Sequence, residues 1–228
     1  MSDENFAFPI LTVDAVVFQL VNNKLTVLLI ERAFEPFLGR WALPGEYIPK
    51  DKSSHQALEH VLVHKTGIST KQLELIEQPY AFDSPERDPR GYAVTVMYIS
   101  LGRNITPGGH KDMDNAQNPQ FFPITELPEL AYDHANIVTF ARNRLKTLST
   151  STNVVGALLP GAFTFLQLQD AYEAIFGKSL DKRNFRKKML SLNLIEPTGD
   201  IAKDGAHRPA QLYTFRKVQS KNLDQSFD

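Results

Sequence analysis

The chain has 228 residues, 42% of them hydrophobic and 22% charged, and a formal net charge of −1 at pH 7. This composition is typical of a globular protein with one large domain or two smaller ones, and it excludes a disordered chain. The absence of cysteine excludes disulfides, thiol nucleophiles and thiolate zinc sites. No apolar run approaches the ~20 residues of a membrane-spanning helix, and the N-terminus is acidic, so we expect a cytoplasmic protein with no membrane partner.

The predicted elements of the N-terminal part mix strands with helices. Two apolar runs rich in β-branched residues, 11–20 and 25–31, flank Asn22 and Asn23, which is a pattern typical of a β-hairpin. Further strands are predicted at residues 73–82, 93–101 and 120–123, and a helix at residues 137–145. We therefore expect an α/β domain over residues 1–150.

A helix is also predicted over residues 53–66. Its apolar side chains fall at positions 57, 58, 61 and 62, which is a helical spacing. Ser53 and Gln56 have the spacing of a capping box, and Gly67 is a typical helix stop. The capping box, the spacing of the apolar residues and the final glycine thus all indicate one amphipathic helix.

A domain boundary is predicted within residues 146–153, which are rich in Ser and Thr and show no core pattern. Beyond it two helices and two strands are predicted, in the order 166–176, 181–192, 194–199 and 210–215. Helix, turn, basic helix and two-stranded wing is the pattern of a winged helix-turn-helix. We expect this DNA-binding domain at residues 155–218 and a mobile tail at 219–228.

The second helix of this domain is strongly basic. Residues 150–228 carry 11 Lys and Arg against 8 Asp and Glu, so the near-neutral total hides a positive C-terminal part. An apolar stripe of Phe185, Met189 and Leu192 leaves the opposite face free for a major groove. The candidate DNA-binding residues are Lys182, Arg183, Asn184, Arg186 and Lys187 on the helix, and Lys203, His207 and Arg208 on the wing loop. A basic surface helix alone is often merely solvated, so the wing pattern is what favours DNA.

The segment from Trp41-Ala-Leu-Pro-Gly45 to Thr66-Gly67-Ile68 resembles the Nudix box, Gly-x5-Glu-x7-Arg-Glu-U-x-Glu-Glu-x-Gly-U, in which U is apolar. We aligned the two on Gly67 without gaps. The box glutamates and the arginine are then replaced by Lys52, His60, Val61, His64 and Lys65. The frame and length of the box are kept, whereas every acidic position is lost.

This loss has a chemical meaning. In the Nudix hydrolases that the segment resembles, glutamates on one helix face hold Mg²⁺, which bridges the diphosphate and activates water. Lys65, together with protonated His64, would repel a metal ion and still attract phosphate. The helix is then either part of a ligand pocket or simply a core helix, and no metal, cofactor or catalytic residue is expected. Zinc chelation by His60 and His64, with His55 nearby, is the remaining metal alternative.

Several later motifs resemble those of NrtR-type regulators, which join a Nudix-like sensor to a winged-helix DNA-binding domain. The motifs are Arg87-Asp-Pro-Arg-Gly91, Tyr132-Asp-His134, Leu180-Asp-Lys-Arg-Asn-Phe-Arg-Lys187, Glu196-Pro-Thr-Gly199 and His207-Arg-Pro-Ala-x-Leu-Tyr213. The resemblance covers nearly the whole chain and implies a Nudix-like α/β/α sandwich with a mixed sheet, followed by the winged helix. It also implies a homodimer that binds a double-stranded DNA operator and a small-molecule effector, which is an ADP-ribose-like nucleotide linked to NAD metabolism or a sugar.

The candidate ligand-binding residues of the sensor are Arg32, Arg40, Lys65, Arg87, Asp88 and Arg90. Arginine suits bidentate phosphate contacts, but Arg87 and Asp88 could instead pair locally and shape a turn. Trp41 is expected in the core rather than as a stacking platform. Asp133 is expected to cap the following helix, with ligand contact or an interface as alternatives for residues 132–134.

The leading hypothesis is a metabolite-responsive transcriptional repressor with a catalytically inactive Nudix-like domain. The alternative is a Nudix hydrolase of ADP-ribose or a related nucleoside diphosphate derivative, which would use carboxylates outside the box such as Glu46, Asp51 or Glu59. A third reading, an interaction module with neither DNA nor ligand, leaves the basic helix without a role.

Overall fold

The computed structural model describes residues 8–108, 116–202 and 209–216, which form two compact units. The N-terminal unit contains the residues up to 18 and those from 26 to 141. The C-terminal unit contains residues 19–25 and the residues from 142 onward. Within the described residues, no helix is long and apolar enough to cross a membrane.

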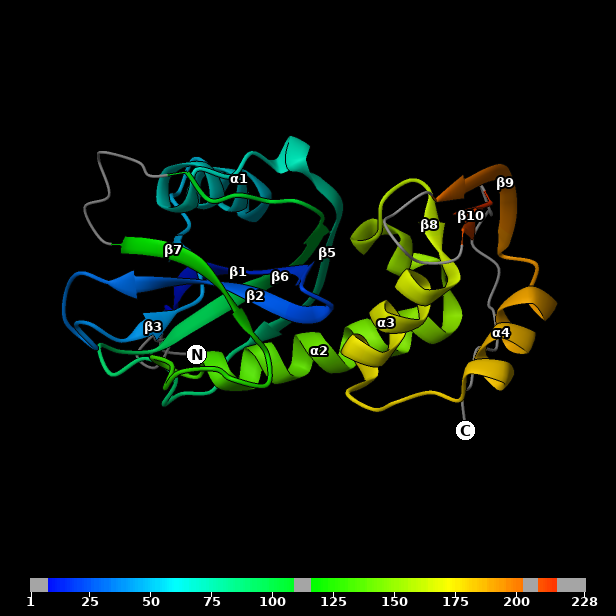
Figure 1. Cartoon of the computed structure of the whole chain (residues 1–228). Helices are drawn as coiled ribbons and strands as arrows, with labels where there is room; N and C mark the ends of the chain where they lie inside the picture. Colours follow the sequence, from blue (N-terminus) through cyan, green and yellow to red (C-terminus); the bar gives the residue numbers. More distant parts are fainter. Residues whose placement is uncertain (1–7, 109–115, 203–208, 217–228) are drawn as a thin grey trace, which may run out of the picture. The chain divides into compact units, whose positions relative to one another are not determined.

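A mixed sheet forms the centre of the N-terminal unit (Figure 1). Its strands are β1 Ile10–Val21, β2 Lys24–Arg32, β3 Trp41–Ala42, β4 Gly45–Tyr47, β5 Leu73–Phe82, β6 Ala93–Gly102 and β7 Ala116–Pro123. The strand order is β3-β2-β1-β6-β5, and β4 pairs with β1 and β7 with β2. The β1–β6 pair is parallel, whereas β1–β4, β2–β7 and β5–β6 are antiparallel. The predicted hairpin is confirmed, because Asn22 and Asn23 take the positive φ values of 50° and 59° that its two-residue turn requires.

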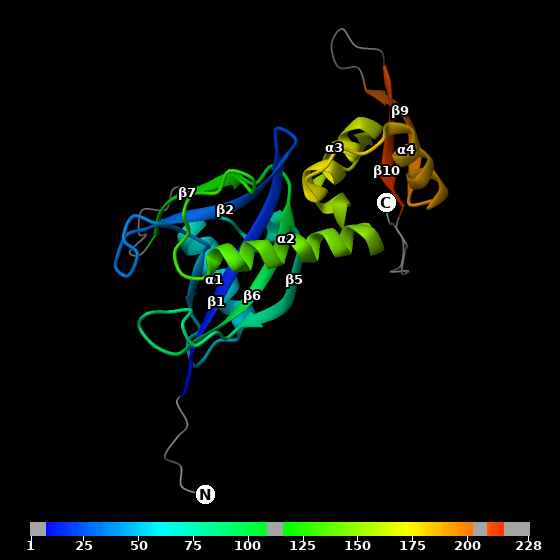
Figure 2. The same ribbon diagram turned by 90° about the horizontal axis from the view of Figure 1, so that it is seen from below.

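Helix α1, Ser54–Thr66, covers one face of this sheet (Figures 1 and 2). Both hydrogen bonds of the predicted capping box between Ser53 and Gln56 are present, and Gly67 ends the helix in the left-handed conformation. The buried side chains Ala57, Leu58, Val61 and Leu62 pack against Val13, Ala15 and Val17 of β1. The helix is therefore fixed both by its own capping signals and by burial of its apolar stripe.

Helix α2, His134–Ser151, begins on the opposite face, where Ile137, Val138 and Ala141 are buried. This arrangement confirms the α/β/α sandwich. The helix runs through residues 146–151 of the segment in which the domain boundary is predicted, and the two compact units divide between residues 141 and 142. Inside the helix the hydroxyls donate to carbonyl oxygens three or four residues earlier, as Ser149 does to Leu145 at 2.7 Å, which satisfies them without ending the helix.

The C-terminal unit is a winged helix. Its elements are η2 Val154–Leu158, β8 Phe163–Thr164, α3 Phe165–Phe176, α4 Lys182–Ser191, β9 Ile195–Ala202 and β10 Ala210–Phe215. The strands form a sheet in the order β8-β10-β9. Thr164 begins α3 with a capping box, and the Asp181 side chain accepts a hydrogen bond of 2.8 Å from the Asn184 backbone at the start of α4. Tyr172 of α3 and Phe185 of α4 are buried together, with ring centroids 5.4 Å apart.

Candidate ligand and nucleic-acid sites

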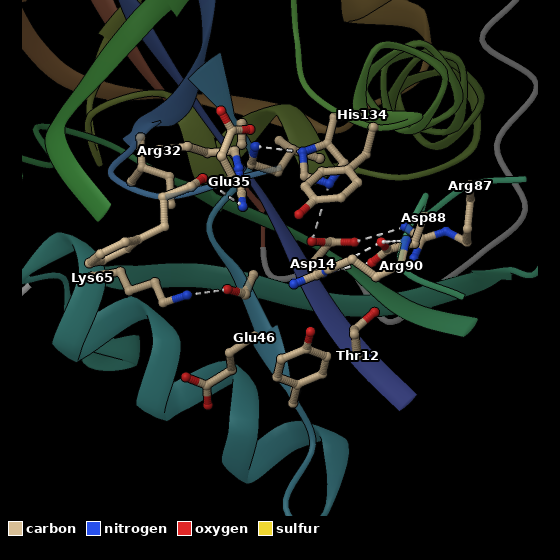
Figure 3. Close-up of a pocket in the computed structure, with 17 residues that line it drawn as sticks. Thr12, Asp14, Arg32, Glu35, Glu46, Lys65, Arg87, Asp88, Arg90 and His134 are labelled. Atoms are coloured by element: carbon tan, nitrogen blue, oxygen red, sulfur yellow. Dashed lines mark hydrogen bonds and ion pairs between the residues drawn. The ribbon is translucent and has the colours of Figure 1, made fainter. Parts of the chain in front are cut away.

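A cavity of about 280 Å³ lies in the N-terminal unit (Figure 3). Its lining comes from strands β1 to β4, the loop between β2 and β3, α1, the loop after β5 and the start of α2. Of the six predicted ligand-binding residues, the structure brings five to this cavity: Arg32, Lys65, Arg87, Asp88 and Arg90. Arg40 is not among the lining residues, because its guanidinium donates to Glu129 over 2.6 Å on the exposed surface. Trp41 packs edge-to-face on Phe122 at 4.6 Å.

The guanidinium of Arg87 is part of a buried ionic network. Its Nε and Nη2 donate to the Asp133 carboxylate over 3.1 Å and 3.0 Å, and Nη2 also donates to Asp14 over 3.3 Å. The alternative in which Arg87 pairs with Asp88 is therefore wrong. The cap predicted for Asp133 is wrong as well, because its carboxylate is bound by Arg87, and only its main-chain carbonyl accepts from the start of α2. Arg87 thus holds the site together and has little charge left for a ligand.

His134 lies beside this network and is buried. The Leu43 backbone N–H donates to His134 Nδ1 over 2.9 Å, so the ring proton resides on Nε2, which lies 3.6 Å from Asp14 Oδ1. Burial lowers the pKa of His134 and outweighs the opposing effect of the nearby carboxylates. The imidazole is therefore neutral at physiological pH and acts as a fixed dipole.

Position 45 must be glycine because its backbone lies too close to this network to leave room for a side chain. A Cβ atom at Gly45 would lie 2.1 Å from Asp14 Oδ1 and 2.8 Å from the Val13 carbonyl oxygen. Sequence reasoning missed Asp14 as a site residue. The available signal was an acid inside the otherwise apolar strand Val13-Asp-Ala-Val-Val17, since a carboxylate is buried in a strand only when it has partners.

Asp88 and Arg90 form the wall of the cavity on the loop after β5. Arg90 donates to the Asp88 carboxylate through Nη2 over 2.6 Å and through Nε over 2.9 Å. Burial alone would raise the pKa of Asp88, but the hydrogen bonds from the side chain and backbone of Arg90 outweigh it and lower that pKa. The guanidinium of Arg90 also lies 5.4 Å from the ring of Tyr47, so the pair is braced on an aromatic surface.

Tyr132 and Arg32 form the facing wall. The Arg32 guanidinium carbon lies 4.9 Å from the centroid of the Tyr132 ring. Arg32 donates to the main-chain carbonyls of Pro36 and Phe34 over 2.7 Å and 3.2 Å, which holds the loop before β3 at the cavity. Tyr132 has a φ of 54°, and its hydroxyl is buried without a hydrogen-bond partner among the described residues. Burial raises the pKa of this phenol, so it is a neutral donor.

Lys65 reaches the same cavity from α1 (Figure 3). Its Nζ donates to the main-chain carbonyl of Gly45. Burial lowers the pKa of the ammonium, while Glu46 and Asp14 raise it and Arg32 lowers it further. The cation is thus held inside the cavity rather than on the surface.

A metal site does not fit the residues of the degenerate box. Val61 is buried in the core, and His60 is bound to Glu46 over 2.9 Å and stacked on His64 at a ring distance of 4.0 Å. Among the described residues, no group of three His, Asp or Glu side chains could hold a metal ion, and the zinc alternative has no support there. Lys65 places a positive charge where a Nudix box carries a glutamate.

The candidate DNA-binding surface is the outer face of α4. Lys182, Arg183, Asn184 and Lys187 are exposed there, opposite the buried Phe185 and Met189. Arg186 is also exposed, but it is engaged within the unit. Its guanidinium donates to the Tyr213 hydroxyl over 3.1 Å and lies 4.4 Å from the ring of Phe165, so it anchors α4 to β10 and α3. The predicted wing contacts Lys203, His207 and Arg208 lie outside the described residues.

A cavity-bearing α/β/α domain joined to a winged helix defines a class of DNA-binding regulator with its own ligand-binding domain. Residues 11–141 match the NUDIX domain, and residues 155–215 match the NrtR DNA-binding winged helix domain. The chain belongs to the NrtR-type family of Nudix-related transcriptional regulators.

Relatives along nearly the full length of the chain agree with this assignment. The ADPR responsive transcriptional repressor NtrR of Acinetobacter baylyi is 32% identical over 215 residues, which is 92% of this chain and 84% of that protein. The crystal structure of Shewanella oneidensis NrtR complexed with a 27mer DNA is 33% identical, with a TM-score of 0.74 and coverage of 90% and 93% of the two chains. The NUDIX domain of the same NrtR, complexed with ADP ribose, is also 33% identical, with a TM-score of 0.55 over 64% of this chain and 94% of that one.

Proposed function

We propose that this protein is a transcriptional repressor that binds operator DNA as a homodimer and is controlled by ADP-ribose or a closely related nucleotide. In this proposal the exposed face of α4 enters the major groove, and the cavity of the N-terminal unit binds the effector without hydrolysing it. The relatives named above support the pairing of DNA with ADP-ribose.

The chemistry of the cavity supports a nucleotide over a sugar. A diphosphate needs positive groups, and Arg32 and Lys65 supply them. Tyr47 and Tyr132 line the same space and offer aromatic surfaces to a base or a ribose. Asp14, Glu35, Glu46 and Asp88 line the same cavity, so the observation that favours ADP-ribose is the presence of Arg32 and Lys65, which donate to main-chain carbonyls and make no ion pair with a carboxylate among the described residues.

Hydrolysis is left out of the proposal because the carboxylates that it requires are not assembled. Of the three acids in the hydrolase alternative, Glu46 lines the cavity but is bound to His60 over 2.9 Å. Glu59 is half-exposed and lies 3.9 Å from His55 on the outer face of α1, and Asp51 is exposed. The main observation against hydrolysis is that Lys65 occupies a metal-ligand position of the box.

Control by a ligand requires that ADP-ribose prefer the form of the dimer that cannot bind DNA. We therefore expect ADP-ribose to lower the affinity for the operator. A labelled duplex from the region upstream of the gene, titrated with the protein across a salt series, measures this affinity by fluorescence anisotropy. Binding that weakens steeply with salt and is reduced by ADP-ribose is expected.

The same samples test the absence of hydrolysis. ADP-ribose incubated with the protein and Mg²⁺ should be recovered intact, whereas release of AMP would revive the hydrolase alternative. A glucose or ribose titration under the same conditions is the control for a sugar effector. Duplex binding that responds to a sugar but not to ADP-ribose contradicts the proposed effector and leaves the repressor in place.

A further inference from the structure

Lys65 is a partly buried cation at a position that Nudix hydrolases give to an anion. Its side chain extends from α1 into the cavity, where Nζ donates to the Gly45 carbonyl (Figure 3). The backbone amide beyond that carbonyl belongs to Glu46, and Asp14 lines the same space. An ammonium carries three N–H bonds, and among the described residues it makes one hydrogen bond, to Gly45.

The cations of the cavity differ in how far they are neutralised. Arg87 is bound to two carboxylates, and Arg90 is bound to Asp88. Lys65 and Arg32, in contrast, donate to main-chain carbonyl oxygens among the described residues, which carry no net charge. These two side chains therefore keep their positive charge available for an anion.

Burial makes this charge effective. A cation in a partly water-excluded cavity attracts an anion more strongly than the same cation on the surface, because less solvent screens the pair. The free protein bears a desolvation penalty for Lys65, and a phosphate group that pairs with it compensates that penalty. The cavity is thus prepared for an anionic ligand before the ligand arrives.

We propose that the Lys65 ammonium replaces the divalent cation of the Nudix enzymes, so that this cavity binds a diphosphate without any metal ion. The inference rests on the proposed function, since it assumes an effector with a diphosphate. Mg²⁺ in a Nudix enzyme both offsets phosphate charge and activates water. A tethered ammonium offsets phosphate charge but cannot activate water. The replacement of the box glutamate by Lys65 therefore accounts both for effector binding and for the loss of hydrolysis.

The test is isothermal titration of the full-length protein with ADP-ribose, once in EDTA and once in excess Mg²⁺. The native protein should bind with the same affinity in both buffers. Lys65→Met should bind about ten- to a hundredfold more weakly, as expected for loss of a charge-assisted hydrogen bond in a buried site. Lys71→Met is the matched control, because Lys71 is exposed on the short helix η1, outside the cavity, and its removal should change nothing.

A charge reversal sharpens the test. Lys65→Glu should abolish binding in EDTA and regain part of it in Mg²⁺, since a carboxylate at this position restores one ligand for the metal. Circular dichroism and the duplex affinity of each variant check that it is folded. Native protein that binds ADP-ribose only with Mg²⁺, or Lys65→Met that binds as tightly as the native protein, overturns the inference.

Failure of the proposed effector gives a different result. If the native protein binds its duplex but not ADP-ribose in either buffer, the proposed effector is wrong, and inorganic pyrophosphate then tests the inference by itself. Metal-independent pyrophosphate binding that is lost in Lys65→Met supports the role of Lys65. Absence of pyrophosphate binding to the native protein rejects it.

Discussion

The carboxylate of Asp133 and the guanidinium of Arg87, 46 residues apart in the chain, are joined by two hydrogen bonds of 3.0 Å and 3.1 Å. Their side chains are only 14% and 4% exposed. The pair ties the loop after β5 to the start of α2, and it gives a structural role to Arg87, which was expected to bind the ligand, and to Asp133, which was expected to cap α2. Its main role is to hold the cavity in shape.

Removal of one member of this pair should destabilise the protein. Asp133→Asn leaves a buried guanidinium with a single carboxylate partner, and we expect a loss of about 3 kcal/mol in the free energy of unfolding. Urea denaturation followed by circular dichroism measures it. The control is Glu129→Gln in the exposed Arg40–Glu129 pair, which should change stability by less than about 1 kcal/mol. Equal effects of the two substitutions would contradict the structural role given to Arg87.

Gly45→Ala should damage both stability and effector binding. The added methyl group would lie 2.1 Å from Asp14 Oδ1 and 2.8 Å from a backbone oxygen, so β4 must shift away from β1. We expect a loss of at least about 2 kcal/mol in unfolding free energy and a marked loss of ADP-ribose affinity. Gly161→Ala is the control, because its Cβ meets no atom within 4 Å. Thermal melting and calorimetric titration of both variants decide the matter.

Two kinds of arginine on α4 should respond differently to substitution. Arg183→Ala removes an exposed side chain, so it should weaken duplex binding and, if Arg183 contacts a phosphate, lower the salt slope by about 1 without changing the melting temperature. Arg186→Ala removes the contacts with Tyr213 and Phe165 and should lower the melting temperature as well. Anisotropy across a salt series and thermal melting measure both properties. A melting temperature unchanged in Arg186→Ala would show that these contacts do not anchor the helix.

Effector affinity should depend on pH through Lys65. Burial lowers the pKa of the ammonium, with Arg32 adding to this effect and Glu46 and Asp14 opposing it. Because the diphosphate pairs with the charged form, affinity should be constant at low pH and fall as pH rises through the lowered pKa. Lys65→Arg keeps its charge at all accessible pH values and should remove the fall. Calorimetric titrations from about pH 6 to about pH 10 test this, and a fall that persists in Lys65→Arg assigns it to another group.

Local signals made most of the fold predictable. The Asn22-Asn23 turn, the capping boxes at Ser53 and Thr164 and the Asp181 cap all lie next to the elements that they define, and the structure contains each of them. Strands β3, β4 and β8 have only two or three residues, so they leave no periodicity in the sequence. Their pairing is set by partners far along the chain.

The candidate site was predictable only in part, for the same reason. Arg32, Lys65 and Arg90 could be predicted as cavity residues from their residue type and motif position, because arginine and lysine near a Nudix-like helix suggest phosphate binding. Which cations are neutralised depends on carboxylates that lie many residues away, such as Asp14 for Arg87 and Glu129 for Arg40. Local sequence does not contain this information.

The buried hydroxyl of Tyr132 has a consequence for signalling. A phenol that makes no hydrogen bond among the described residues, on a residue held at a φ of 54°, stores free energy in the ligand-free form. An effector oxygen that accepted from this hydroxyl would release that energy two residues before α2 begins. We therefore expect Tyr132 to be a point at which occupancy of the cavity changes the energy of the helix that leads toward the winged helix in the sequence.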